Sequence, residues 1–437
     1  MQEIIVVEQS GPLSGEVLLH GAKNATLVMM AALLLPRGVS QLYNVPNIAD
    51  VHIMIKVLEV LGVAASYNAE THTLTVDATT VSSVRIPAHL MQQMRASILV
   101  MGSLLARVGH ATLGLPGGDA IGKRPIDFHL KAFRKMGVTV TEEDDMIAAH
   151  TEQLKAARIT LEYPSVGATE NTILAALGAR GRTTIINAAF EPEVTDLIQL
   201  LQAMGAAITV EVPATIHIDG GAALHPVSYT VMPDRLEAGS LMLATVTTGG
   251  SISLPNARPY TMDLFLAKLE EMGHIVEIGM GGKGLSCKAS INPTAVSIKT
   301  APYPGFPTDL QAPMSVAQLV ARGMSVIEET VFENRLQHIP ELCKMGARAH
   351  AETPSKAIMH GDAQLHGAEV IASDIRASFA LVLAGFVAQG TTYIHGVHHW
   401  RRGYTSLEKT LARLGASIRI EKGFGAPQSV HAEVLRL

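Results

Sequence analysis

Apolar and small side chains recur along this chain in six blocks, each followed by a shorter segment of mixed polarity. Each block is nearly uncharged over about three helical turns. A helix that is apolar on most of its faces is buried rather than lying on a surface. The pattern therefore predicts six buried helices, over residues 21–35, 94–109, 166–181, 236–250, 308–323 and 375–390.

A second helical segment follows each buried helix and ends in Leu-Gly or Met-Gly. The six glycines lie roughly 70 residues apart, at Gly62, Gly137, Gly205, Gly273, Gly346 and Gly415. Glycine favours the left-handed conformation that ends a helix, and alternating residues typical of a strand resume behind each one. The same order recurs six times, so we expect an α/β fold with six copies of a small α/β subdomain. Their sheets should surround the buried helices.

One polar loop concentrates chemistry between an apolar run and the next predicted helix. LPGGDAIGKRP, residues 115–125, contains three glycines, a carboxylate and two cations. Such a backbone can converge on an anion with its N–H groups. Gly117, Gly122 and Lys123 fit the GxxxxGK pattern of a nucleotide P-loop. Arg124, however, occupies the position where a Ser or Thr would hold magnesium, so the P-loop interpretation stays open.

Basic residues recur at equivalent points of distant repeats. Helix N-termini are favourable sites for anions. Four basic residues lie near predicted helix starts, at Lys23, Arg95, Arg235 and Arg376, and six lie in polar loops, at Lys123, Arg124, Arg258, Arg335, Arg401 and Arg402. This distribution indicates a cleft that binds a multiply charged anion from both sides.

Composition narrows the class of protein. The 437 residues are 48% hydrophobic and 17% charged, so a large core is expected and disorder is not. A net charge of -5 without a basic stripe disfavours nucleic-acid binding. Two distant cysteines, Cys287 and Cys343, exclude a disulfide framework.

The N-terminal sequence lacks a signal-peptide pattern, and no apolar run reaches the roughly 20 residues that a membrane span needs. We expect a cytoplasmic protein that uses no metal or other cofactor.

Nine dispersed motifs resemble those of one enzyme family. They are GAKNA (21–25), MRAS (94–97), LPGGDAIGKRPID (115–127), PSVGAT (164–169), PDRLEAG (233–239), FPTDLQA (306–312), TVFENR (330–335), DIRAS (374–378) and RRGY (401–404). In this order they resemble the UDP-N-acetylglucosamine enolpyruvyl transferases (1-carboxyvinyltransferases). The shikimate-using enolpyruvyl transferases are more distant relatives, and PSVGAT, TVFENR and the RPID segment favour the UDP-sugar.

The resemblance implies a fold and a reaction. The fold is a two-domain, inside-out α/β barrel, with residues 22–230 forming one domain and residues 1–21 plus 231–437 the other. The active site would lie in the interdomain cleft, beneath the loop 115–125. The reaction transfers the enolpyruvyl group of phosphoenolpyruvate to the 3-hydroxyl of UDP-N-acetylglucosamine and releases phosphate, the first committed step of peptidoglycan synthesis. Its partners are these two small molecules, with no cofactor, nucleic acid or membrane.

The resemblance also implies the site residues. Catalytic roles fall to Asp119 as the acid, Asp309 as a general base, Lys23 and Arg402. The phosphoenolpyruvate site comprises Lys23, Asn24, Arg124, Arg335, Arg376 and Arg402. The nucleotide-sugar pocket comprises Asn24, Arg95, Arg124, Pro125, Ile126, Asp127, Phe128, Tyr163, Pro164, Ser165, Val166, Gly167, Asp309 and Val331.

Some of these residues have simpler explanations when each is considered alone. Asp309 could be only a helix N-cap, and Arg95 or Arg376 could be a solvated residue at a helix end. Glu191 and Glu193 are interpreted as a charge pair at a helix start. A P-loop nucleotide-binding protein, and a non-catalytic binder of nucleotide sugars, remain as alternative functions.

Asp119 departs from the family pattern, which usually has Cys in this loop. We expect Lys123 and Arg124 to hold a free Asp119 ionised, and substrate binding to raise its pKa so that it gains a proton. A carboxylate lacks the nucleophilicity of a thiolate, so we predict resistance to the epoxide antibiotic fosfomycin, which alkylates the usual Cys. Phe190 stands where a basic residue is usual, and Arg401 where an acidic one is.

Overall fold

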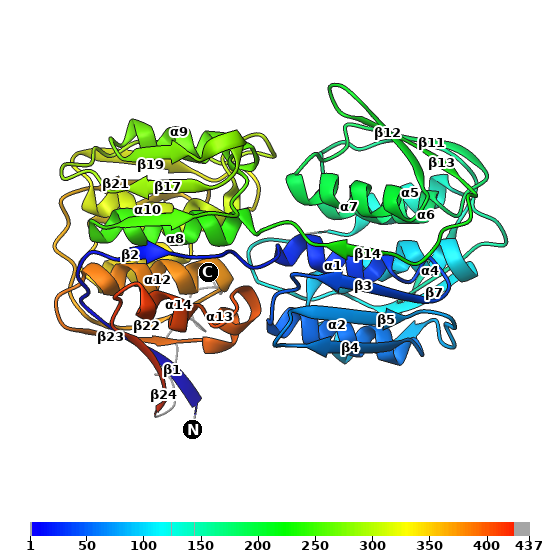
Figure 1. The fold of residues 1–437 in the computed structure, drawn as a ribbon, viewed down its shortest axis with the longest axis horizontal. Coiled ribbons are helices and arrows are strands. Elements are labelled where there is room, and N and C mark those ends of the chain that lie inside the picture. The colour runs from blue at the N-terminus through cyan, green and yellow to red at the C-terminus, as the bar shows by residue number, and fades with distance from the viewer. Residues whose placement is uncertain (1, 124, 144, 424–437) are drawn as a thin grey trace, which may run out of the picture.

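The computed structural model describes residues 2–123, 125–143 and 145–423. Six four-stranded sheets surround two separate groups of helices, which lie side by side in Figure 1. One hydrophobic core is built from residues 22–232, and the other from residues 5–19 and 236–416. We call the regions around these two cores the first lobe and the second lobe.

All six sheets have the same topology. In each, an edge strand runs parallel to the second strand, and the third and fourth strands are antiparallel to their neighbours. The sheets of the first lobe are β14 (Ser228–Thr230), β3 (Val39–Tyr43), β5 (Thr73–Asp77), β4 (Ala64–Asn68); β6 (Arg85–Ile86), β7 (His110–Gly114), β9 (Met146–His150), β8 (Thr139–Glu143); and β10 (Arg158–Thr160), β11 (Gly181–Ile186), β13 (Thr215–Gly220), β12 (Ala207–Glu211).

The second lobe repeats this arrangement with help from the N-terminal segment. Its sheets are β2 (Ser14–Glu16), β15 (Ser251–Leu254), β17 (Leu285–Lys288), β16 (Ile275–Ile278); β18 (Ile298–Lys299), β19 (Met324–Glu328), β21 (Lys356–His360), β20 (Ala349–Thr353); and β22 (Glu369–Ile371), β23 (Thr391–His395), β1 (Gln2–Glu8), β24 (Ile418–Gly423). Strand β1 lies between β23 and β24, and β2 pairs with β15. The first 16 residues therefore complete two sheets whose other strands lie more than 230 positions later.

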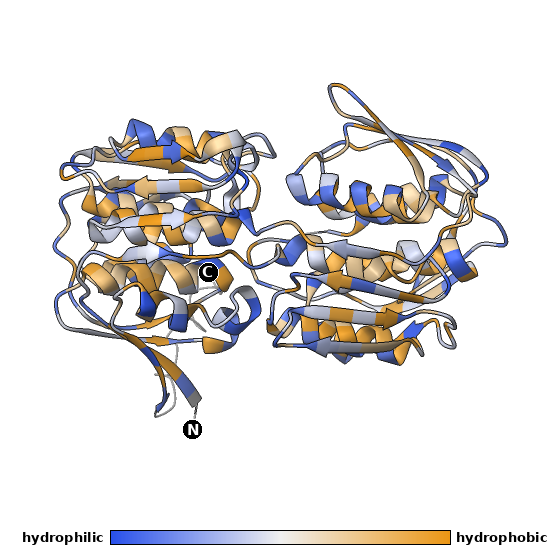
Figure 2. Cartoon of the chain, viewed as in Figure 1, coloured by the Kyte–Doolittle hydropathy of each residue, from blue (hydrophilic) through white to orange (hydrophobic). Residues whose placement is uncertain are grey.

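The predicted buried helices are confirmed. They are α1 (Lys23–Ala32), α4 (Val100–Val108) after the 3₁₀ helix η1 (Arg95–Leu99), α6 (Val166–Ala176), α8 (Arg235–Thr248), α10 (Gln311–Val320) after the 3₁₀ helix η4 (Thr308–Leu310), and α12 (Ile375–Val387). Helices α4 and α6 pack together in the first lobe, as do α8, α10 and α12 in the second. Figure 2 shows hydrophobic residues concentrated on the helices that the sheets surround.

The second helices also form as predicted, with glycine behind each. They are α2 (Ala49–Val60), α5 (Asp127–Lys135), α7 (Pro192–Ala203), α9 (Asp263–Glu271), α11 (His338–Lys344) and α14 (Leu407–Arg413). All six glycines have a positive φ, between 80° and 108°. This left-handed conformation strains any other residue, which explains the recurring Gly. Further helices lie outside this repeat, at α3 (Ala88–Met91), η2 (Pro259–Thr261), η3 (Met280–Gly282) and α13 (Val397–Gly403).

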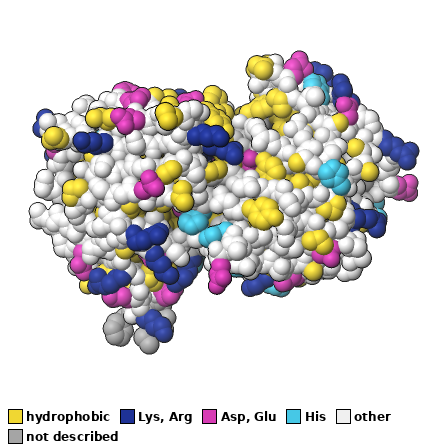
Figure 3. Space-filling model, viewed as in Figure 1, with side chains coloured by type: hydrophobic (Ala, Val, Ile, Leu, Met, Phe, Trp, Pro, Cys, Tyr) yellow, Lys and Arg dark blue, Asp and Glu magenta, His cyan; other side chains and the backbone are white. Residues whose placement is uncertain are grey.

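Two chain segments connect the lobes, and they pair with each other. Ala22 donates its N–H to the Met232 carbonyl at 2.8 Å, and Asp234 donates to the His20 carbonyl at 2.8 Å. Figure 1 shows both segments crossing between the two lobes, and Figure 3 shows the surface indented along this boundary, with acidic and basic side chains intermixed on the face in view. The connection is short and hydrogen-bonded, so it brings the helix starts of both lobes close together.

Among the described residues, none of the helices is both long and apolar enough to cross a membrane. Both cysteines are free thiols; Cys287 is buried in β17 and Cys343 is exposed on α11.

Candidate active site

A cavity of about 440 Å³ lies where the first helices of all six repeats begin. It is lined by the first residues of α1, η1 and α6 from the first lobe and of α8, η4 and α12 from the second, which are Lys23, Arg95, Val166, Arg235, Thr308 and Ile375. Helix N-termini carry unpaired N–H groups and partial positive charge. The sixfold repeat therefore builds one cavity suited to an anionic ligand.

The cavity brings together most of the predicted site residues. Its lining includes Lys23, Asn24, Arg95, Asp119, Pro125, Phe128, Tyr163, Pro164, Ser165, Val166, Gly167, Asp309, Val331, Arg335, Arg376 and Arg402. Arg124, predicted to contact both substrates, lies outside the described residues. Two described residues, Ile126 and Asp127, lie outside the lining: Ile126 packs against the core of the first lobe, and Asp127 begins α5 and pairs with Lys131 at 3.2 Å.

Asp119 lies in a chain of charges that joins the two lobes. Arg402, on α13, donates Nη1–H to Asp119 Oδ1 at 2.5 Å and Nε–H to Asp50 Oδ1 at 2.8 Å. Lys23 contacts the other Asp50 oxygen at 3.2 Å, and His399 Nδ1 lies 3.5 Å from Asp119 Oδ1. Burial alone raises the pKa of the Asp119 carboxyl, but His399, Arg402 and Lys23 outweigh it and hold that pKa well below its usual value. Asp119 is therefore ionised here.

The partners of Asp119 differ from those predicted. Lys123 was expected beside it, yet the Lys123 side chain is exposed and the described cations at Asp119 come from elsewhere in the chain. The reason is loop geometry: the glycine-rich segment turns the Asp119 carboxylate toward α1 and α13 rather than toward Lys123. Sequence spacing could not show this, because Arg402 lies 283 positions away.

The loop 115–125 is fastened to the second lobe. The Ala120 carbonyl accepts hydrogen bonds from Gln337 Nε2 at 2.8 Å and from Asn334 Nδ2 at 3.2 Å, and Asn334 N–H donates to the Ile121 carbonyl at 3.1 Å. Gly122 suits this approach because its φ of +147° is one that L side chains rarely adopt, and a Cβ there would also displace the Glu333 carboxylate, one oxygen of which would lie 2.1 Å away. The loop therefore closes over the cavity from the first lobe onto the second.

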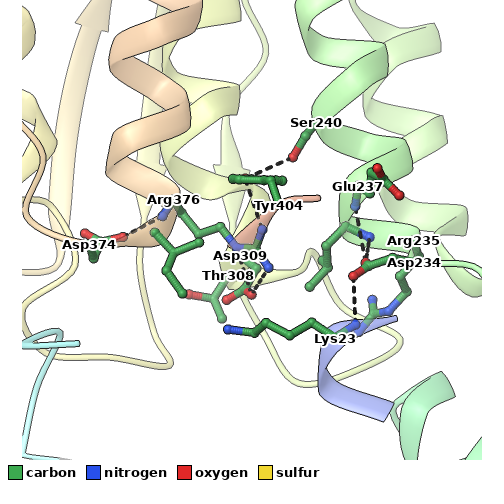
Figure 4. Close-up of polar contacts among 12 residues, drawn as sticks. Lys23, Asp234, Arg235, Glu237, Ser240, Thr308, Asp309, Asp374, Arg376 and Tyr404 are labelled. Carbon is green, nitrogen blue, oxygen red and sulfur yellow. Dashed lines mark hydrogen bonds and ion pairs between the residues drawn. The ribbon is translucent and has the colours of Figure 1, made fainter. Parts of the chain in front are cut away.

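Asp309 forms a second cluster with two arginines, one of which, Arg376, is drawn beside it in Figure 4. Its Oδ1 accepts from Arg335 Nη2 at 2.7 Å, and its Oδ2 accepts from Arg376 Nη2 at 2.8 Å and Nε at 3.1 Å. Burial raises the pKa of Asp309, but both guanidinium groups outweigh it and lower that pKa far below its usual value. Tyr404 OH accepts from Arg376 Nη1 at 3.0 Å, so the arginine is held on a second side.

These contacts settle three of the open interpretations. The N-cap explanation of Asp309 is wrong, because no side-chain cap begins η4 or α10 and the carboxylate faces the arginines. The solvated explanation of Arg376 is wrong, because the residue is 4% exposed. Arg95 lines the cavity and donates to the Pro116 carbonyl at 3.4 Å, so it is not a solvated helix end either.

Aspartates that the motifs left without a role fix the helix starts. Asp234 accepts from Leu236 N–H at 2.7 Å and Glu237 N–H at 3.2 Å, capping α8, and its other oxygen accepts from Lys23 N–H at 3.1 Å. Figure 4 shows this carboxylate between the two helix starts. A cap of this kind contributes about 1 kcal/mol. Asp374 caps α12 in the same way. Asp234 therefore joins the start of α1 in the first lobe to the start of α8 in the second, whereas Asp374 acts within the second lobe.

Glu191 and Glu193 lie at the start of α7, which confirms their interpretation as a helix-start pair. Glu193 is also buried against the second lobe, where its carboxylate accepts from Arg235 Nε at 2.9 Å and Nη2 at 3.2 Å.

Arg401 and Arg402 are neighbours with different partners. Arg401 contacts Glu3 on the surface at 2.9 Å, whereas Arg402 contacts Asp50 at 2.8 Å. The sequence did not single out Asp50, whose position in the first turn of α2 signalled only a favourable helix charge.

The described residues contain no group of three His, Cys, Asp or Glu side chains that could hold a metal ion. The charges in the cavity are instead supplied by side chains and helix ends.

Known proteins are similar to this chain in sequence and in architecture. The family described as EPSP synthase (3-phosphoshikimate 1-carboxyvinyltransferase) matches residues 7–427. A UDP-N-acetylglucosamine 1-carboxyvinyltransferase of Idiomarina loihiensis is 44% identical over 93% of this chain and 96% of the relative. UDP-N-acetylglucosamine 1-carboxyvinyltransferase 1 of Caldanaerobacter subterraneus is 45% identical over 96% and 99%. The chain belongs to the UDP-N-acetylglucosamine 1-carboxyvinyltransferase family.

Solved structures agree with this assignment. The enolpyruvyl transferase NikO from Streptomyces tendae superposes with a TM-score of 0.87 at 26% identity, covering 96% of this chain and 99% of that one. An EPSP synthase from Acinetobacter baumannii, with a TM-score of 0.75 at 19% identity over 97% and 100%, shows the shared fold alone. The predicted inside-out α/β fold is thus confirmed. The P-loop alternative explains only one loop, whereas the family match spans nearly the whole chain.

Proposed function

We propose that this protein transfers the enolpyruvyl group of phosphoenolpyruvate to the 3-hydroxyl of UDP-N-acetylglucosamine, with release of phosphate. The observation that carries the proposal is 44–45% identity to enzymes of that name over nearly the full chain. The cavity supports it, because cationic side chains from both lobes meet there. A 3-phosphoshikimate acceptor has weaker support, since the EPSP synthase neighbours are only 19% identical.

The phosphoenolpyruvate site in this proposal is the set of cations now bound to carboxylates of the chain. Arg335 and Arg376 share Asp309, while Lys23 and Arg402 share Asp50. A ligand with a phosphate and a carboxylate could bind the guanidinium groups of these arginines in the same bidentate way as the carboxylates do. We expect phosphoenolpyruvate to compete with Asp309 and Asp119 for the guanidinium groups, with Arg124 and Asn24 completing the site.

Proton transfer depends on the competition of phosphoenolpyruvate with Asp119 and Asp309 for the guanidinium groups. In the addition step, Asp119 gives its proton to the phosphoenolpyruvate methylene, the sugar 3-oxygen bonds to the neighbouring carbon, and Asp309 takes the hydroxyl proton. In the elimination step, the now ionised Asp119 takes a proton back from the new methyl group, the carbon–oxygen bond to phosphate breaks with release of phosphate, and the double bond re-forms. An arginine-bound Asp309 is a weak base, and an ionised Asp119 carries no proton to give. Anion binding at the arginines raises both pKa values toward the range that the chemistry needs.

The remaining predictions belong to the same proposal. Residues 22–230, and residues 1–21 plus 231–437, act as two domains that close on the substrates. Arg95, Pro125, Phe128, Tyr163 to Gly167, and Val331 hold the nucleotide sugar. The enzyme serves peptidoglycan synthesis in the cytoplasm and resists fosfomycin because of Asp119.

A phosphate-release assay tests the proposal. Purified protein should release phosphate only when phosphoenolpyruvate and UDP-N-acetylglucosamine are both present, without added metal. Release with shikimate 3-phosphate instead would establish the alternative acceptor. Magnesium-dependent release from ATP would favour the P-loop function, and binding of the sugar nucleotide without turnover would indicate a non-catalytic binder.

A further inference from the structure

A third group of carboxylates borders the cavity and has no role in the proposed reaction. It comprises Glu170 on α6 and Glu191 and Glu193 at the start of α7, and we call it the acidic corner. Glu170 and Glu191 line the cavity. Glu170 follows Val166 by four positions, so it lies one turn inward on the helix face that begins at the predicted nucleotide-sugar pocket.

Glu170 is buried without a partner. The residue is 3% exposed, and its Oε1 is closed off from solvent with no hydrogen bond to any described residue. Glu191 Oε2 has the same unsatisfied state, although Glu191 Oε1 accepts from Tyr303 N–H at 3.3 Å. A buried polar atom without a partner is costly, so a ligand that supplies the missing hydrogen bond to Glu170 would bind favourably.

The charges around the corner decide which ligand group fits. Glu193 is neutralised by Arg235, at 2.9 Å and 3.2 Å. Burial, together with repulsion from Glu193 and Glu191, raises the pKa of Glu170 well above its usual value. The raised pKa favours the protonated Glu170 carboxyl, which offers one O–H donor and one acceptor. A phosphate or carboxylate would be repelled here by Glu191, whereas an uncharged hydroxyl or amide would not.

We propose that Glu170 determines acceptor specificity by hydrogen-bonding, through its carboxyl group, to an uncharged hydroxyl or amide of the sugar nucleotide. The proposal rests on the proposed function, because it takes the sugar nucleotide as the ligand of this cavity. It divides the cavity by charge: the arginine clusters bind the anionic groups, and the acidic corner binds a neutral polar group. Glu170 contacts substrate without transferring a proton in the reaction.

Two variants of similar volume separate this role from a structural one. Glu170→Gln keeps a neutral donor and acceptor, so its KM for UDP-N-acetylglucosamine should stay within about threefold of wild type. Glu170→Met keeps the length but leaves the ligand group without a partner, so that KM should rise about 10- to 100-fold. The KM for phosphoenolpyruvate should change less than about threefold in both variants. A merely structural role would lower kcat or change both KM values together.

The outcomes are distinct. If wild type does not turn over these substrates, the proposed function fails and the inference falls with it. If wild type turns over and Glu170→Met leaves the acceptor KM unchanged, the inference alone is overturned. A large rise in that KM for Glu170→Gln would overturn the protonated form. Should Glu170→Met not fold, Glu170→Asp takes its place: the shorter side chain keeps the carboxyl but loses reach, so its acceptor KM should rise at least fivefold, and an unchanged KM overturns the inference.

Discussion

Asp119→Asn is the substitution that bears most directly on the proposed chemistry. The amide has the shape of the carboxylate, and its oxygen can still accept from Arg402, which now contacts Asp119 at 2.5 Å. It cannot deliver a proton to the phosphoenolpyruvate methylene. We therefore expect the variant to fold and to bind substrate while losing the addition step.

The size of the effect follows from the contacts. General acid catalysis typically contributes about 10²- to 10⁴-fold, so kcat should fall by about that factor. The KM for phosphoenolpyruvate should stay level or decrease, because a competing anion has left Arg402, Lys23 and His399. The hydrogen bond to Arg402 stays but loses the negative charge of its acceptor, at a side chain only 13% exposed, so the unfolding free energy should fall by about 1 kcal/mol.

Two readouts separate chemistry from folding. Thermal unfolding establishes that Asp119→Asn is folded at the assay temperature, and phosphate release gives kcat and both KM values. In D₂O, the wild type should incorporate deuterium into the phosphoenolpyruvate methylene through reversible addition, and the variant should not. A variant that keeps more than about a tenth of wild-type turnover, or that still exchanges deuterium, would show that another group supplies the proton.

Further predictions concern the loop and the two ion clusters. Asp119→Cys should keep turnover and gain inactivation by fosfomycin, seen as an adduct in intact mass, while wild type should give no adduct. Gly122→Ala should lower kcat/KM about tenfold or more, because a φ of +147° strains any side chain in this loop and its Cβ also displaces the Glu333 carboxylate. Gly249→Ala is a control with positive φ away from the loop and with open space around it. The pKa of Asp309 is lowered in the folded chain, so its ion pairs stabilise the fold above the unfolded value of about 3.9 and lose that contribution as pH falls below it. Unfolding free energy measured from pH 6 to 3 should therefore fall more steeply in wild type than in Asp309→Asn, and equal slopes would contradict the lowered pKa.

The repeated pattern of the chain was sufficient to predict the six α/β subdomains and their buried helices, whereas the inside-out, two-domain arrangement came from the family resemblance. Apolar blocks and Leu-Gly or Met-Gly endings report local requirements, namely burial of a helix and a left-handed cap. Both are properties of a few consecutive residues. The six buried helices and the six glycine caps therefore appear where the pattern places them.

The contacts between site residues were harder to predict from the sequence, because they join segments that lie far apart in the chain. Asp50 and Arg402 lie 352 positions apart, and Asp309 and Arg376 lie 67 apart. Each residue alone fits a simpler explanation, such as a helix cap or a solvated end. The error about Lys123 has the same origin, since neighbours in a glycine-rich loop need not point the same way. Glu170 gave no signal at all, because one acidic residue in an apolar helix does not reveal that it lines a cavity.

One measurement tests the central claim most directly. Wild-type protein is incubated with phosphoenolpyruvate labelled with ¹³C in its three carbons, together with equal amounts of UDP-N-acetylglucosamine and shikimate 3-phosphate, and the products are identified by mass spectrometry. We predict one labelled product, the enolpyruvyl ether of UDP-N-acetylglucosamine, formed in step with free phosphate. Label found on shikimate 3-phosphate, or on neither acceptor, would contradict the proposed reaction.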